Sequence, residues 1–175
     1  MNVFWSEREK KDLEIITSFK EAAEIAVPVL YRMRLSDDNS PIYQICGPIS
    51  TGGLGSTEAN LCFFNRAIQV AEYHGLLVFD QLPFQEAFDR IASQSNGDYC
   101  TDILDIFYRE VFGSGLIDVF SFLRGWGTSK GSTWEREIAS KFGIRVEDYP
   151  MEWLPEIDTL EACHRSLFMP RPIAV

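Results

Sequence analysis

The fold class follows from residues 116–137, which read LIDVFSFLRGWGTSKGSTWERE. The first eight residues form a short apolar run, typical of a strand that is buried on both faces of a parallel sheet. A glycine-rich loop follows, and a helix then carries Trp134, Ile138 and Phe142 along one face. A buried strand, a loop and a helix make up the repeating unit of α/β folds, so this stretch predicts that class.

The same order of elements continues on both sides of this stretch. Upstream, apolar runs at residues 42–46 and 76–79 flank an amphipathic helix, and downstream a short strand is expected at residues 144–146. Alternating strands and helices predict right-handed crossovers and a parallel sheet with helices on both faces. We therefore expect a three-layer, Rossmann-like α/β fold whose mainly parallel sheet has about four or five strands.

The two ends of the chain lie outside this alternation. Residues 4–34 carry apolar side chains at steps of three and four, which predicts one added N-terminal helix with a kink or a break near Pro28. The proline-bearing end predicts a surface segment with a helix at residues 157–167. One structural domain in three parts is expected: a helical extension (1–40), an α/β domain (41–150) and a C-terminal wrap (151–175).

Composition and charge limit the partners. The 175 residues are 46% hydrophobic and 13% aromatic, enough for an ordered core. A balance of 16 basic against 26 acidic residues argues against binding a nucleic-acid polymer or an anionic membrane, but does not exclude a small nucleotide. No apolar run approaches the roughly 20 residues of a membrane span, and no signal peptide is recognised at the start. We therefore expect a cytoplasmic protein whose four cysteines are reduced thiols.

Two glycine-rich loops are the best candidates for ligand binding. Each follows a strand and precedes a helix, so both are expected at the carboxyl edge of the sheet, where helix N-termini present unpaired N–H groups. Neither loop matches a dinucleotide fingerprint or a P-loop, and no metal-binding motif is present. The two loops predict a ligand cleft; the alternative is a pair of tight turns.

Two carboxylates near these loops have two readings each. Glu135 follows Ser132 by three residues and can close a capping box, or it can act in the cleft as a nucleophile or as a stabiliser of a developing sugar cation. Asp118 lies within an apolar run, where Asp is uncommon. It is either a strand-entry residue that bonds nearby backbone or a second carboxylate of the site.

Several segments together resemble the nucleoside 2-deoxyribosyltransferase-like superfamily. The segment Gly125–Glu135 is similar to the pattern G-W-x-x-S-x-G-x-x-x-E of its small bacterial and phage members. Ile45-Cys46-Gly47-Pro48-Ile49 resembles the first strand and loop, and Ile117-Asp118-Val119 resembles the strand that carries the family's aspartate. The resemblance covers residues 42–147.

This resemblance implies an enzyme that cleaves the N-glycosidic bond of a nucleoside, a nucleotide or a related small molecule, as a hydrolase or a deoxyribosyltransferase without a cofactor. Glu135 takes the role of the nucleophile that attacks C1′, and Asp118 that of the supporting aspartate. The positions implied to contact substrate are Gly47, Pro48, Ile49, Ser50, Gly53, Asn60, Trp126, Ser129 and Gly131.

One position favours a different function. Gln44 stands on the first strand where active members often carry a tyrosine, three residues before the glycine. A second hypothesis is therefore a module that binds a nucleotide-like ligand without turning it over. A third is a structural or interaction protein.

The apolar stripe of the N-terminal helix must be covered by the rest of the chain or by another subunit. We expect a homodimer or a higher assembly, with residues 4–34 or the helix at residues 101–112 in the interface. The rings of Phe107, Tyr108 and Phe112 suit an interface core. The alternative is a monomer in which the stripe packs within the chain.

Overall fold

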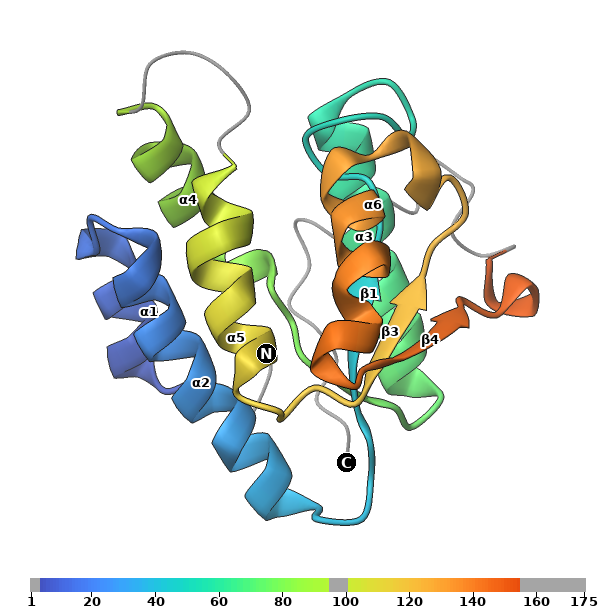
Figure 1. The fold of residues 1–175 in the computed structure, drawn as a ribbon, viewed down its shortest axis with the longest axis horizontal. Coiled ribbons are helices and arrows are strands. Elements are labelled where there is room, and N and C mark those ends of the chain that lie inside the picture. Colours follow the sequence, from blue (N-terminus) through green and yellow to red (C-terminus); the bar gives the residue numbers. More distant parts are fainter. Residues whose placement is uncertain (1–3, 95–100, 155–175) are drawn as a thin grey trace. The chain divides into compact units, whose positions relative to one another are not determined.

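A computed structural model describes residues 4–94 and 101–154 of the chain (Figure 1). These residues form two compact units, which we treat separately. Residues 41–79 and 118–154 form the α/β unit, and residues 4–40 with 80–94 and 101–117 form the helical unit. Residues 80–94 and 101–117 therefore group with the N-terminal helices, whereas the order of elements in the sequence predicts that they belong with the sheet.

The α/β unit is built on a four-stranded sheet whose strands are all parallel, in the order β2-β1-β3-β4. The strands are β1 (Ile42–Cys46), β2 (Leu77–Val78), β3 (Val119–Phe122) and β4 (Arg145–Asp148). In the central pair, Gln44 lies opposite Phe120 and Cys46 lies opposite Phe122. The predicted three-layer, Rossmann-like α/β fold with a mainly parallel sheet is confirmed.

One helix covers each face of the sheet. Helix α3 (Thr57–Tyr73) covers one face. There the hydroxyl of Tyr149, the residue just after β4, donates to the Ala67 carbonyl of α3 at 2.9 Å. Helix α6 (Lys130–Ile138) covers the opposite face, where the Arg136 guanidinium lies 5.0 Å from the ring centre of Phe122. Side chains alternate along a strand, so Gln44, Cys46 and Phe122 all point towards α6.

The helical unit contains α1 (Glu7–Ile15), α2 (Phe19–Ser36), α4 (Gln85–Ala92) and α5 (Arg109–Gly113), with a π-helical segment at Ile103–Tyr108 before α5. Aromatic rings fill its core: the ring centres of Phe84 and Phe107 are 4.9 Å apart, and those of Phe88 and Phe107 are 4.8 Å apart. The Arg90 guanidinium closes the end of α1 by donating to the carbonyls of Leu13 and Ile16.

The prediction of one helix over residues 4–34 with a kink or a break near Pro28 is wrong. The break comes earlier, at Ile16, whose backbone leaves the helical conformation, and α2 then begins after Ser18. Ser18 and Glu21 form a capping box that starts the new helix. Pro28 lies inside α2, where the helix continues through it because its neighbours Ala26 and Val29 are fully buried.

The proposed role of Phe107, Tyr108 and Phe112 as an interface core is also wrong. Phe107 and Phe112 are 0% and 1% exposed in a single chain, because they pack within the helical unit. The large apolar side chains that this unit does expose include Tyr31 and Leu35 on α2, at 56% and 69%. The state of assembly remains a prediction.

Other expectations have mixed outcomes. Cys46 is a free, buried thiol, but Cys62 is disulfide-bonded, so the expectation of a reduced thiol is wrong there.

The helix expected at residues 157–167 lies outside the described residues. Within the described ranges no helix combines the length and the apolarity needed to cross a membrane.

Candidate functional site

Helix α6 begins three residues earlier than its sequence suggests. Its N-cap is Ser129, whose Oγ accepts a hydrogen bond from the Ser132 backbone N–H at 3.4 Å. The predicted capping box of Ser132 and Glu135 is therefore wrong: Ser132 already lies in the first turn and Glu135 in the second. Glu135 is therefore not explained as a residue that caps the helix.

Glu135 points instead from α6 towards the sheet, and it is only 5% exposed. The Gln44 side chain on β1 donates from Nε2 to Oε1 of Glu135 at 2.9 Å, and the nearby Cys46 thiol donates to the Gln44 carbonyl oxygen at 3.8 Å. Burial raises the pKa of Glu135 to about 8, and the neighbouring Cys46 and Gln44 side chains only partly oppose that rise. Below pH 8 the folded protein therefore holds Glu135 mainly as a neutral acid.

Two further polar atoms beside Glu135 are buried. Gln44 Oε1 and Ser132 Oγ have no hydrogen-bond partner among the residues that the structure describes. Buried polar atoms are nearly always paired in folded proteins, so unpaired ones mark a strained or functional place. We call Gln44, Cys46, Ser132 and Glu135 the polar cluster.

The two glycine-rich loops are joined at the carboxyl edge of the sheet, as expected from their order. The Gly53 N–H donates to Thr128 Oγ1 at 2.9 Å, and the Lys130 N–H donates to Thr51 Oγ1 at 3.2 Å. At Gly52, φ is +71° and a Cβ atom would clash with the Thr128 carbonyl oxygen. Only glycine allows this approach of the two backbones.

Asn60 supports the first loop from the start of α3. Its Oδ1 accepts from the Leu54 N–H at 2.7 Å, and its Nδ2 donates to the carbonyls of Ile49 and Gly52 at 2.9 and 3.0 Å. The side chain is 3% exposed and its amide is fully used by these bonds. Asn60 therefore shapes the loop rather than contacting a ligand directly.

The other residues expected to contact substrate fall into two groups. Ser50 and Gly53 are exposed on the first loop, and Ile49, Gly131 and Trp126 are half-buried. Gly47, Pro48 and Ser129 have structural roles: a Cβ on Gly47 would lie 2.7 Å from Leu123, Pro48 is buried, and Ser129 caps α6. The Trp126 ring is occupied by Arg136, whose guanidinium lies 4.5 Å from it.

Asp118 lies at the other end of the strands. It comes directly before β3, and its Oδ2 accepts from the Ile42 backbone N–H, at the start of β1, at 2.7 Å. This bond is the one expected of a strand-entry residue. The loops follow the carboxyl ends of the strands, so the structure places Asp118 at the amino edge, away from them.

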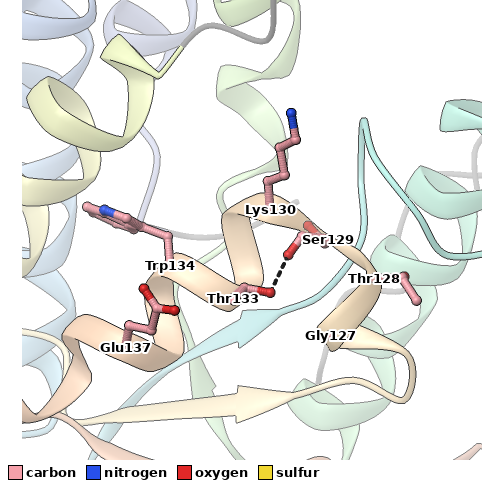
Figure 2. A pocket seen from close by; sticks show the side chains of 7 residues that line it. All are labelled: Gly127, Thr128, Ser129, Lys130, Thr133, Trp134 and Glu137. Atoms are coloured by element: carbon pink, nitrogen blue, oxygen red, sulfur yellow. Dashed lines mark hydrogen bonds between the residues drawn. The ribbon is translucent and has the colours of Figure 1, made fainter.

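A pocket of about 310 Å³ lies on the outer side of α6 (Figure 2). Lys130, Trp134 and Glu137 project into it from one side of the helix, and the Thr133 hydroxyl donates to the Ser129 carbonyl at 2.8 Å beside them. Its lining residues are Gly127, Thr128, Ser129, Lys130, Thr133, Trp134 and Glu137. Glu135 is not among them, because it faces the sheet.

Most of the polar cluster does not follow from local patterns in the sequence. A capping box pairs Ser132 with Glu135, but it brings neither Gln44 nor Cys46 to them. A signal was present: Gln44 is a polar residue within an apolar strand, and strand alternation puts it on the same face as Cys46. Across the described residues, no group of three His, Cys, Asp or Glu side chains is placed to hold a metal ion.

Comparisons with protein-family models, with curated proteins and with solved structures gave no match to this chain.

Proposed function

We propose that this protein cleaves the N-glycosidic bond of a nucleoside, a nucleotide or a related small molecule, with Glu135 as the nucleophile. The observation that carries the proposal is the Glu135 carboxyl itself, buried against β1 and hydrogen-bonded by Gln44. A carboxyl with a strongly raised pKa next to unpaired buried polar atoms is more typical of a reactive site than of a structural contact. The family resemblance of residues 42–147 supports the same reaction.

The chemistry requires the ionised carboxyl. The Glu135 carboxylate forms a bond to C1′ of the sugar while the bond from C1′ to the base nitrogen breaks, and the base leaves with the electron pair. Attack on C1′ by water or by a second base then releases Glu135. Because the free protein binds a proton at Glu135 up to about pH 8, kcat/KM should rise with pH and level off above that value.

The test is to incubate the protein with a panel of nucleosides and nucleotides and to detect free base by chromatography. Glu135→Gln should fold normally and lose nearly all turnover while it still binds substrate. Glu24→Gln, at an exposed position of α2, is the matched control and should keep full activity. Normal turnover by Glu135→Gln would overturn the catalytic assignment.

The pocket on the outer side of α6 favours a second candidate, a module that binds a nucleotide-like ligand without reaction. Trp134 offers a ring for stacking and Lys130 a positive charge, while Glu135 lies outside this pocket. Equilibrium dialysis with the same panel separates the two functions. Binding without free base, lost in Trp134→Ala and kept in Glu135→Gln, would support the binding module.

We also propose a homodimer or a higher assembly. Its support is the exposure of Tyr31 and Leu35, four residues apart on the same side of α2. A small-molecule ligand and a second copy of the chain are thus the partners that we propose.

A further inference from the structure

The contact between Gln44 and Glu135 joins two well-held groups. Gln44 is the middle residue of β1 and is 0% exposed, and β1 pairs with a strand on each side. Its Nε2 lies 2.9 Å from Oε1 of Glu135, which itself lies in the second turn of α6. The donor thus comes from the centre of the sheet, and the amide reaches one particular oxygen of the carboxyl.

The two oxygens of the Glu135 carboxyl therefore differ. A neutral carboxylic acid carries its proton on one oxygen, and the other oxygen is the better acceptor. An amide N–H directed at Oε1 favours the form in which Oε1 accepts and the proton lies on Oε2. When the acid ionises, the same bond continues to occupy Oε1, and Oε2 keeps the more available lone pairs.

We propose that Gln44 is a positioning residue that directs the acidic proton of Glu135, and with it the reactive lone pair, to Oε2. This inference rests on the proposed function for its consequence in catalysis, whereas the effect on the carboxyl can be measured without any substrate. The other groups beside Glu135 do not distinguish its two oxygens in this way. Ser132 Oγ has no partner among the described residues, and the Cys46 thiol, the titratable neighbour that acts on Glu135, donates its proton to the Gln44 carbonyl oxygen at 3.8 Å.

The first experiment measures the titration of Glu135 by carbon NMR of its labelled carboxyl, assigned by comparison with Glu135→Gln. Gln44→Met keeps the length of the side chain and removes the N–H donor. Because that bond stabilises the ionised form, its loss should raise the pKa of Glu135 by about one unit. Gln81→Met is the matched control: Gln81 is also buried, with an unpaired Oε1 among the described residues, but lies in the helical unit.

A second variant decides the matter if Gln44→Met fails to fold. Gln44→Glu has nearly the same size and puts a second carboxyl at hydrogen-bond distance from Glu135. Two carboxyls this close share one proton and titrate in two well-separated steps. Two independent titrations in Gln44→Glu, or an unchanged Glu135 pKa in Gln44→Met, would overturn the proposal.

Turnover gives the catalytic readout. With a substrate found in the panel, Gln44→Met should lower kcat about tenfold, leave KM within about twofold, and move the pH profile to match the NMR pKa. If the pKa moves as expected but no compound in the panel yields free base, the positioning role stands and the proposed function fails. If free base forms but the pKa does not move, the positioning role fails alone.

Discussion

The burial of Glu135 makes the stability of the protein depend on pH. Its pKa is about 8 in the folded chain and near 4.5 in an unfolded one. Between these values the unfolded state binds fewer protons than the folded state, so the free energy of unfolding falls as pH rises. The stabilisation is complete below about pH 4.5 and is lost by about pH 8, a change on the order of 5 kcal/mol.

We therefore expect the protein to be more stable at pH 5 than at pH 9, and Glu135→Gln to remove most of this difference. Glutamine does not ionise, so the variant should match the parent protein at pH 5 and exceed it at pH 9. Urea unfolding at pH 5, 7 and 9 measures both proteins. An equal dependence on pH in the variant would show that Glu135 titrates near its ordinary pKa.

At the scale of elements, two serines at the start of α6 should contribute differently to stability. Ser129 caps the helix, so Ser129→Ala should cost about 1 kcal/mol of stability. Ser132 is buried and its Oγ has no partner among the described residues, so Ser132→Ala should change stability by less than about 0.5 kcal/mol. Thermal unfolding of both variants checks this, and the reverse order of costs would favour the helix start first inferred from the sequence.

The junction of the two loops can be tested through its glycines. Gly52→Ala would force a Cβ against the Thr128 backbone and should cost about 3 kcal/mol. Gly55 also has positive φ, at +92°, but a Cβ there meets no neighbouring atom. Gly55→Ala should therefore cost only the backbone strain, about 1 kcal/mol. Equal costs in denaturant unfolding would mean that the two loops do not touch in solution.

At the scale of the whole molecule, the assembly is the main open prediction. Light scattering at micromolar concentration should give a mass at least twice the 20.0 kDa of one chain. The double substitution Tyr31→Glu with Leu35→Glu should reduce it to one chain, because charges would replace the exposed apolar side chains of α2. Tyr73→Glu, at an 87% exposed position on α3, is the control. A mass of 20 kDa for the unchanged protein at all concentrations would refute the dimer.

Local patterns were enough to predict the strands of the α/β unit, but not the start of α6. The apolar run at Ile42–Cys46 became β1 with those limits, and the four parallel strands followed from the alternation of strands and helices. Glu135 stands out by its place after a glycine-rich loop, and the structure buries its carboxyl against β1. These features depend on side-chain periodicity and on glycine conformation over a few residues, which the sequence displays directly.

Contacts between distant residues decided the rest. Ser129 and Ser132 can each cap a helix by local chemistry, and the structure selects Ser129, where the first residue of α6 also bonds Thr51, 79 positions away. Asp118 pairs with Ile42, 76 positions away, which places it at the amino edge. The partnership of Gln44 and Glu135 spans 91 positions and exists only because α6 packs on that face of β1. No short-range pattern encodes such pairings, since they form only when the sheet has brought separate segments together.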